Sequence, residues 1–294
     1  MNKGLKINYL NSFLHLYFYI LEDKINSTQN ELNSIKFQSE EANTDEFVKR
    51  YFKEYILKNP TIKGTNLKSL CINIDSNPIT IKIDRFNTFQ VINVFLPAEL
   101  DETKKKKISE TKNAVYTSPD LYLEISDGET SYFESLELKS TKNNNIPGSS
   151  VQQVAPFEWV IFVKRSEKKT IVSTGHYINS ITEKLPFPDR SPRPQIGFNT
   201  LQQWNKKNRA VKNNILFINY DSSQNQSKIK LLADWQDYLA SEWLNIVQSN
   251  KAQKNEKWFN NALRKFALKF LEYTETLSTE EKQKLTDTLN SLIK

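Results

Sequence analysis

Cysteine and histidine are scarce in this chain, which has one cysteine and two histidines among 294 residues. With Cys71 alone, the chain can form no intrachain disulfide and no zinc cluster of several thiolates. Catalysis through an imidazole would have to use His15 or His176, and neither has a recognisable nucleophile setting. His15 lies in a segment with helical apolar spacing, so we expect it to pack in the core.

Glycine is also rare, with six residues, and the chain has no glycine-rich phosphate loop, zinc motif or internal repeat. An apolar stretch over residues 9–21 is interrupted by Asn11, Ser12 and His15, and it is too short to span a bilayer. Its apolar residues recur at helical spacing, which predicts an amphipathic helix facing the core. We therefore expect a cytoplasmic protein with no membrane partner.

The charge balance is moderately basic, with 41 Lys and Arg against 34 Asp and Glu and a net charge of +7. Such a balance suits a polyanionic partner, although many soluble proteins are equally basic. The length allows one large domain or a domain with an added lobe. We predict a first domain over residues 1–225 that includes the N-terminal helices. A helical lobe over residues 226–294 would pack on this core or form a dimer contact.

The most informative segment reads as a β-hairpin. Residues 121–126, LYLEIS, alternate apolar and polar side chains, and Asp127-Gly128 is a strong turn signal. Residues 132–140, YFESLELKS, then alternate again. This pattern predicts two antiparallel strands with one apolar face that packs on a core.

The pairing register of this hairpin decides which side chains meet. If the turn has four residues, Ser126 pairs with Ser131 and Asp120 lies opposite Glu137. A two-residue turn would move Asp120 two positions along the partner strand. In both registers the period of two leaves Asp120, Glu137 and Lys139 on one face.

Two carboxylates and an amine on one sheet face would suit a hard divalent cation. Directly opposed carboxylates repel each other, and a cation between them would turn that repulsion into coordination. Mg²⁺ takes oxygen ligands and usually keeps several waters. The alternative is that these side chains form only an exposed, charged hairpin face.

The pattern Pro119-Asp120 … Glu137-Leu138-Lys139 resembles the signature of the PD-(D/E)XK nucleases, and in particular of type II restriction endonucleases. The resemblance covers about residues 46–164. It implies an α/β (α+β) fold with a mixed central sheet flanked by helices, a restriction-endonuclease-like core, here with a helical C-terminal lobe. It also implies that Asp120, Glu137 and Lys139 are catalytic, and that Asp120, Glu137 and the Leu138 carbonyl bind Mg²⁺.

Many members of this family add an acid from a helix before the hairpin, and Glu46 is the best match here. Glu46 also fits a capping box that begins at Asn43, so its alternative role is to cap the Asn43 amide. The sequence leaves both roles open.

The resemblance implies a homodimer that hydrolyses double-stranded DNA at a short specific site. The products would carry 5′-phosphate and 3′-hydroxyl ends. Two alternatives remain open: a DNA-binding module whose carboxylates are only structural, and a repair or mobile-element nuclease on the same core.

Predicted elements on both sides of the hairpin agree with such a core. We expect a helix over about residues 43–58, three short strands within residues 69–97 and a buried strand over residues 158–164. The charge-dense residues 101–113 indicate a solvated loop, or alternatively a loop that grips phosphate beside the active site. Further elements are a short helix at 151–157, strands near 170–173 and 214–220, and helices over 228–294, where Ser278 to Glu281 forms a capping box.

Six polar side chains are candidates for contacts to DNA. Arginine and glutamine in the proline-rich residues 185–208 are of the types that read guanine and adenine edges, although arginine on a loop can equally contact only phosphate. The others lie in or beside the polar loop after the hairpin, where a glutamine is more often simply solvated. The set comprises Arg190, Arg193, Gln195, Gln152, Asn144 and Lys142.

Overall fold

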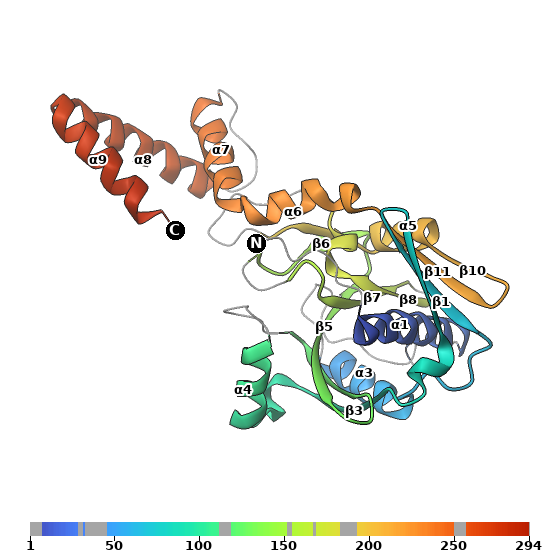
Figure 1. The fold of residues 1–294 in the computed structure, drawn as a ribbon. Helices are drawn as coiled ribbons and strands as arrows, with labels where there is room; N and C mark the ends of the chain where they lie inside the picture. Colours follow the sequence, from blue (N-terminus) through green and yellow to red (C-terminus); the bar gives the residue numbers. More distant parts are fainter. Residues whose placement is uncertain are drawn as a thin grey trace. The chain divides into compact units, whose positions relative to one another are not determined.

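The computed structural model describes residues 8–28, 32, 46–111, 119–151, 155–166, 169–182, 193–249 and 257–293 (Figure 1). The fold is mixed α/β, with antiparallel and parallel strand pairs and flanking helices, as predicted. The chain divides into two compact units. The first comprises Met1–Pro186 and Ser191–Ala233, and the second comprises Phe187–Arg190 and Asp234–Lys294.

A five-stranded sheet forms the centre of the first unit. Its order is β3-β4-β5-β7-β8, where β5 and β7 are parallel and the other neighbours are antiparallel. The predicted hairpin is β4–β5, and the predicted buried strand β7 lies between β5 and β8. The strands are β3 (Gln90–Phe95), β4 (Leu121–Ser126), β5 (Ser131–Thr141), β7 (Trp159–Arg165) and β8 (Thr170–His176).

The hairpin has the four-residue turn considered above. Ser126 pairs with Ser131, and the register continues to Leu121 opposite Leu136. The Asp127 carboxylate accepts hydrogen bonds from the backbone N–H groups of residues 129 and 130 at 2.9 and 2.8 Å. Gly128 adopts φ +101°, a conformation that other residues rarely take, so the Asp-Gly pair fixes both turn and register.

Two smaller sheets complete the first unit. The four-stranded sheet has the order β10-β11-β1-β2, in which β1 and β11 are parallel, and the two-stranded sheet pairs β6 with β9. The three strands predicted within residues 69–97 all form, but two join the four-stranded sheet and β3 joins the central one. The bounds are β1 (Ser69–Ile74), β2 (Asn77–Lys82), β6 (Asn145–Pro147), β9 (Gln195–Gly197), β10 (Arg209–Lys212) and β11 (Ile215–Tyr220).

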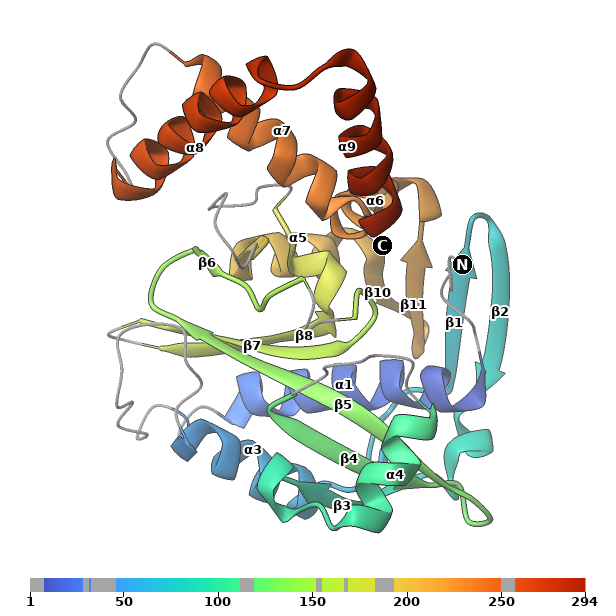
Figure 2. The ribbon, with the colours of Figure 1, turned by 90° about the vertical axis from the view of Figure 1, so that its left-hand side faces the viewer.

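Helices cover both faces of the central sheet. On one face, α1 (Tyr9–Thr28) and α3 (Glu46–Lys58) pack with the leucines and isoleucines of β4 and β5 in the main core. The other face is covered by α4 (Glu102–Thr111) and α5 (Phe198–Asn208). Figure 2 shows α1 and α5 on opposite sides of β7 and β8. Short 3-10 helices are η1 (Ile83–Phe86), η2 (Pro97–Glu99), η3 (Tyr177–Ser180) and η4 (Ser222–Asn225).

The charge-dense segment corrects one prediction, because it forms the helix α4 rather than a loop. Ile108 of α4 is buried with Leu100 against Tyr122 and Phe133 of the hairpin. This small apolar contact attaches an otherwise polar helix to the sheet. Of the short helix predicted at 151–157, the described residues Val151 and 155–157 form no helix.

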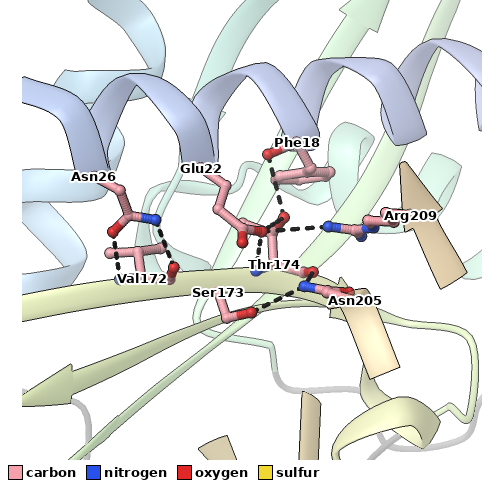
Figure 3. Close-up of polar contacts among 8 residues, drawn as sticks. All are labelled: Phe18, Glu22, Asn26, Val172, Ser173, Thr174, Asn205 and Arg209. Atoms are coloured by element: carbon pink, nitrogen blue, oxygen red, sulfur yellow. Dashed lines mark hydrogen bonds and ion pairs between the residues drawn. The ribbon is translucent and has the colours of Figure 1, made fainter. Parts of the chain in front are cut away.

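A polar layer joins α1 to β8 at the edge of the central sheet (Figure 3). The Asn26 side chain bonds both the N–H and the C=O of Val172 at 2.9 Å. The Glu22 carboxylate accepts from the Thr174 N–H and hydroxyl, each at 2.8 Å, and pairs with Arg209 at 3.3 Å. These bonds satisfy edge-strand groups that would otherwise lack partners.

The boundary between the units lies after α6 (Gln226–Ala233), whereas the predicted boundary was 225/226. Leu232 of α6 packs against a core cluster of the first unit, and the Lys228 ammonium donates to the Ile178 carbonyl at 3.4 Å. These contacts explain why α6 belongs to the first unit. Helical patterning in the sequence does not show to which unit a helix belongs.

The second unit contains α7 (Trp235–Gln248), α8 (Lys257–Glu275) and α9 (Thr279–Leu292). The predicted capping box at Ser278 and Glu281 is confirmed. Phe266 and Phe270 of α8 stack on each other but remain exposed. None of the described helices has the length and apolar character needed to cross a membrane.

Candidate active site

Asp120 lies directly before β4, at the end of the hairpin opposite the turn. Continuing the register of Leu121 and Leu136 places it opposite Glu137. Its Oδ2 accepts a hydrogen bond from the Leu138 N–H at 2.9 Å. Pro119, the preceding residue, has no N–H with which to continue the strand ladder. The Asp120 carboxylate therefore contacts β5 where the backbone pairing of β4 ends.

Glu137 and Lys139 lie two residues apart on β5, and their side chains meet as the period of two predicts. The Lys139 Nζ is 2.6 Å from Glu137 Oε1. Both residues are buried, with 5% and 9% of their surfaces exposed. Leu138 lies between them, so the three predicted catalytic side chains surround one backbone position. The N–H and C=O of a strand residue point to the same side, so the Leu138 carbonyl points toward the side of Asp120.

A loop from the β6 segment contacts Glu137. The Ser149 hydroxyl donates to Glu137 Oε1 at 2.7 Å, and the Ser149 N–H donates to the Tyr177 hydroxyl oxygen at 2.8 Å. Burial raises the pKa of the Tyr177 phenol, which therefore stays neutral. A side chain at Gly148 would collide with the Tyr177 hydroxyl and lie 2.7 Å from the Pro194 carbonyl. Glycine thus allows the loop to reach Glu137.

Lys49 of α3, like Ser149, is a residue at this site that the sequence did not indicate. Its Nζ lies 2.8 Å from Asp120 Oδ1. The site therefore contains two carboxylates, Asp120 and Glu137, and two ammonium groups, Lys49 and Lys139. The repulsion expected between the two acids is balanced within the chain by these lysines.

Glu46 does not join the two acids. Its side chain is 50% exposed, and its carboxylate pairs with Arg50 one turn along α3 at 3.2 Å. Among the described residues, no group of three or more His, Cys, Asp or Glu side chains is placed to hold a metal ion. The cap that Glu46 was predicted to form involves Asn43, which lies outside the described residues.

The remaining oxygen ligands still suit Mg²⁺. This ion is commonly bound by only one or two carboxylates and keeps several waters. Asp120 and Glu137 supply two carboxylates, and the Leu138 carbonyl is the third oxygen that could complete the set. The lysine pairs show that both carboxylates already attract cations.

The candidates for DNA contact lie in different settings. Gln195 begins β9 opposite Pro147, and its side chain accepts from the Thr182 hydroxyl at 2.9 Å. The Asn144 side chain accepts from the Lys164 ammonium at 2.5 Å. Arg193 and Lys142 are exposed. Gln152 and Arg190 lie outside the described residues.

Arg193 and Gln195 belong to a segment whose backbone is hydrogen-bonded to the loop at the site. Pro194, between Arg193 and Gln195, accepts the Gly148 N–H at 2.8 Å. Gly148 precedes Ser149, whose hydroxyl contacts Glu137. The segment that contains Arg193 therefore lies beside the loop whose Ser149 contacts Glu137.

The helix α4 adds lysines on the face that carries Glu137. It packs on Phe133, which is four residues before Glu137 on β5 and therefore on the same face. Lys105, Lys106 and Lys107 of α4 are exposed. These lysines lie on a helix fixed to the sheet rather than on the predicted loop, and Lys105 pairs with Glu102 of the same helix at 2.8 Å.

Comparisons with known proteins give no relatives, because no family model and no curated protein matches this chain. The geometry of the hairpin and its neighbours is therefore the basis on which a function can be argued.

Proposed function

We propose that the chain is a Mg²⁺-dependent endonuclease that hydrolyses double-stranded DNA at a short specific site, as type II restriction endonucleases do. The observation that carries the proposal is the meeting of Asp120, Glu137 and Lys139 around Leu138. Glu137 and Lys139 are the charged residues that are buried in the hairpin strands β4 and β5, and buried charge of this kind is common at functional sites.

The chemistry divides among the residues of the cluster. Asp120, Glu137 and the Leu138 carbonyl would hold Mg²⁺, which when bound lowers the pKa of a water and stabilises charge on phosphate oxygens. Lys139 would orient the attacking water through a hydrogen bond from its ammonium group. Ser149 would keep the Glu137 carboxylate in place. Attack at phosphorus in line with the departing 3′ oxygen leaves 5′-phosphate and 3′-hydroxyl ends.

DNA would approach the site from the side of the sheet that carries α4. Lys105 to Lys107 would contact phosphates, and these contacts position a duplex without reading its sequence. Arg193 and Gln195 are candidates for base contacts, since their segment adjoins the site. We propose a homodimer in the cytoplasm, because cutting both strands of a palindromic site needs two sites related by a two-fold axis.

Incubating the purified protein with phage DNA tests this function. Discrete fragments with Mg²⁺ and intact DNA with EDTA are expected, and sequencing the fragment ends would give the recognised site. Smearing would instead indicate a nonspecific nuclease. Intact DNA with Mg²⁺, together with salt-sensitive binding in EDTA, would favour the alternative of a non-catalytic DNA-binding module.

A further inference from the structure

Both oxygens of the Asp120 carboxylate already have a donor. Oδ2 accepts the Leu138 N–H at 2.9 Å, and Oδ1 lies 2.8 Å from the Lys49 Nζ. The amide belongs to the backbone of a central strand and cannot withdraw without disturbing the sheet. Lys49 lies at the end of a flexible side chain that is 23% exposed. A cation that binds Asp120 would therefore displace Lys49 rather than the amide.

From this geometry we infer that Lys49 is an internal cation that competes with Mg²⁺ for Asp120, an inference that rests on the proposed function. Without metal, its ammonium balances the charge of a partly buried carboxylate. When a divalent ion binds, repulsion between like charges drives the ammonium away. Lys49 therefore raises the metal concentration at which the site fills.

Lys139 does not have this role in our account. It pairs with Glu137 from two residues away on the same strand, so it stays beside the site even when its ion pair loosens. Lys49 comes from α3, which packs in the core on the other face of the sheet. The two lysines differ accordingly: one is fixed beside the reaction, and the other can leave.

Lys53, one turn further along α3, offers a matched control. Its Nζ is 2.5 Å from Glu99 Oε1, and its side chain is 25% exposed, close to the 23% of Lys49. Lys53→Met therefore removes the same charge and a similar ion pair from the same helix. It leaves Asp120 untouched.

The test measures the affinity of the full chain for Mn²⁺ by titration calorimetry in the absence of DNA. We expect Lys49→Met to bind Mn²⁺ about tenfold more tightly than the unaltered chain, because it removes both a competitor and a like charge. Lys53→Met should change the affinity by less than about twofold, and Lys49→Arg should restore the weaker binding. Asp120→Asn should abolish the binding event. Equal or weaker binding by Lys49→Met would overturn the inference.

DNA cleavage separates this inference from the proposed function. If Lys49→Met tightens Mn²⁺ binding but no variant cuts DNA, the competition holds and the nuclease proposal fails. If the unaltered chain cuts DNA while Lys49→Met leaves the affinity unchanged, the nuclease proposal stands and the competition fails. If no variant binds metal, both are wrong.

Discussion

At the scale of single residues, the decisive feature is that each of the two carboxylates has both a hydrogen-bond donor and an ammonium group as partners. Asp120 bonds the Leu138 amide and Lys49, and Glu137 bonds Lys139 and Ser149. The Leu138 amide and the Ser149 hydroxyl hold the two carboxylates in position before a metal or a substrate arrives, whereas Lys49 is the partner that a metal would displace. This preorganisation lowers the reorganisation needed during reaction.

Neutral substitutions at these residues test their roles in cleavage. We expect Asp120→Asn, Glu137→Gln and Lys139→Met each to lower the cleavage rate by roughly 10³-fold or more, because each removes a charge that acts on the transition state. Single-turnover cleavage of DNA with Mg²⁺ measures the effect. Circular dichroism should show a folded protein in each case, and Lys53→Met should cut normally. Retention of most activity by any of the three site variants would contradict its assignment.

The two histidines predict a dependence of stability on pH. His15 and His176 are buried, and the Tyr220 hydroxyl lies 3.4 and 3.3 Å from their ring nitrogens. Burial, then the Arg209 charge, lowers the pKa of His176 to about 3. Burial also lowers the pKa of His15 well below its ordinary value, helped by His176 and Arg209.

The sign follows from proton uptake. Below about pH 6.5 the unfolded chain binds protons at these histidines that the folded protein does not bind. The histidines' contribution is therefore complete above pH 6.5 and is lost as the pH falls toward about 3. Stability should fall by up to about 1.4 kcal/mol per pH unit for each histidine. Urea unfolding between pH 7 and pH 5 measures this slope. A variant with both His15→Asn and His176→Asn, if folded at pH 7, should show a flatter slope, and an equal slope would refute the explanation.

Local periodicity explains which residues could be predicted. The alternation of the hairpin and its Asp-Gly turn predicted the observed register, which ends with Leu121 opposite Leu136, and helical spacing indicated that His15 is buried. Lys49 could not be predicted, because its contact depends on how α3 packs on the sheet. Sequence reasoning named Glu46 on that helix as a candidate ligand, because a metal requires an acid, and left open that it only caps the helix.

At the scale of elements, α4 provides the clearest test of how DNA would bind. Changing Lys105, Lys106 and Lys107 to glutamine should weaken binding of duplex DNA by roughly tenfold or more near physiological salt. It should also reduce the slope of log affinity against log salt by up to about three, because each lost phosphate contact removes about 0.9. Fluorescence anisotropy with EDTA measures both quantities without cleavage.

A matched variant controls for net charge. Changing Lys206, Lys207 and Lys212 to glutamine removes three exposed lysines from α5 and β10, at the C-terminal end of α5. This variant should bind DNA nearly as well as the unaltered chain. Equal losses in the two variants would show that overall charge, rather than the position of α4, determines binding.

The same helix shows the limit of predicting elements from charge. Its polar composition indicated a loop, but burial of Ile108 against the hairpin is enough to hold a helix in place. The three strands within residues 69–97 were predicted, whereas their division between two sheets was not. β1 pairs with β11, which is distant in sequence, and this pairing places β1 and β2 in a different sheet from β3. No local sequence pattern indicates such a long-range pairing.

At the scale of the whole molecule, the proposed active site and the helices of the second unit belong to different compact units. Every residue to which we assign chemistry belongs to the first unit, whereas α7 to α9 form the second. The change to purely helical patterning predicted a helical lobe in this part of the chain. The position of the boundary after α6 was not predicted, because that depends on the contacts of Leu232 and Lys228 with the first unit.

The most direct test of the account is to locate Mn²⁺ by anomalous X-ray scattering in crystals soaked with the metal. We predict one strong peak between Asp120 and Glu137, about 2.0–2.2 Å from an oxygen of each, with the Lys49 ammonium moved away from Asp120. A peak elsewhere, or an ion pair between Asp120 and Lys49 that is unchanged at saturating Mn²⁺, would contradict this prediction.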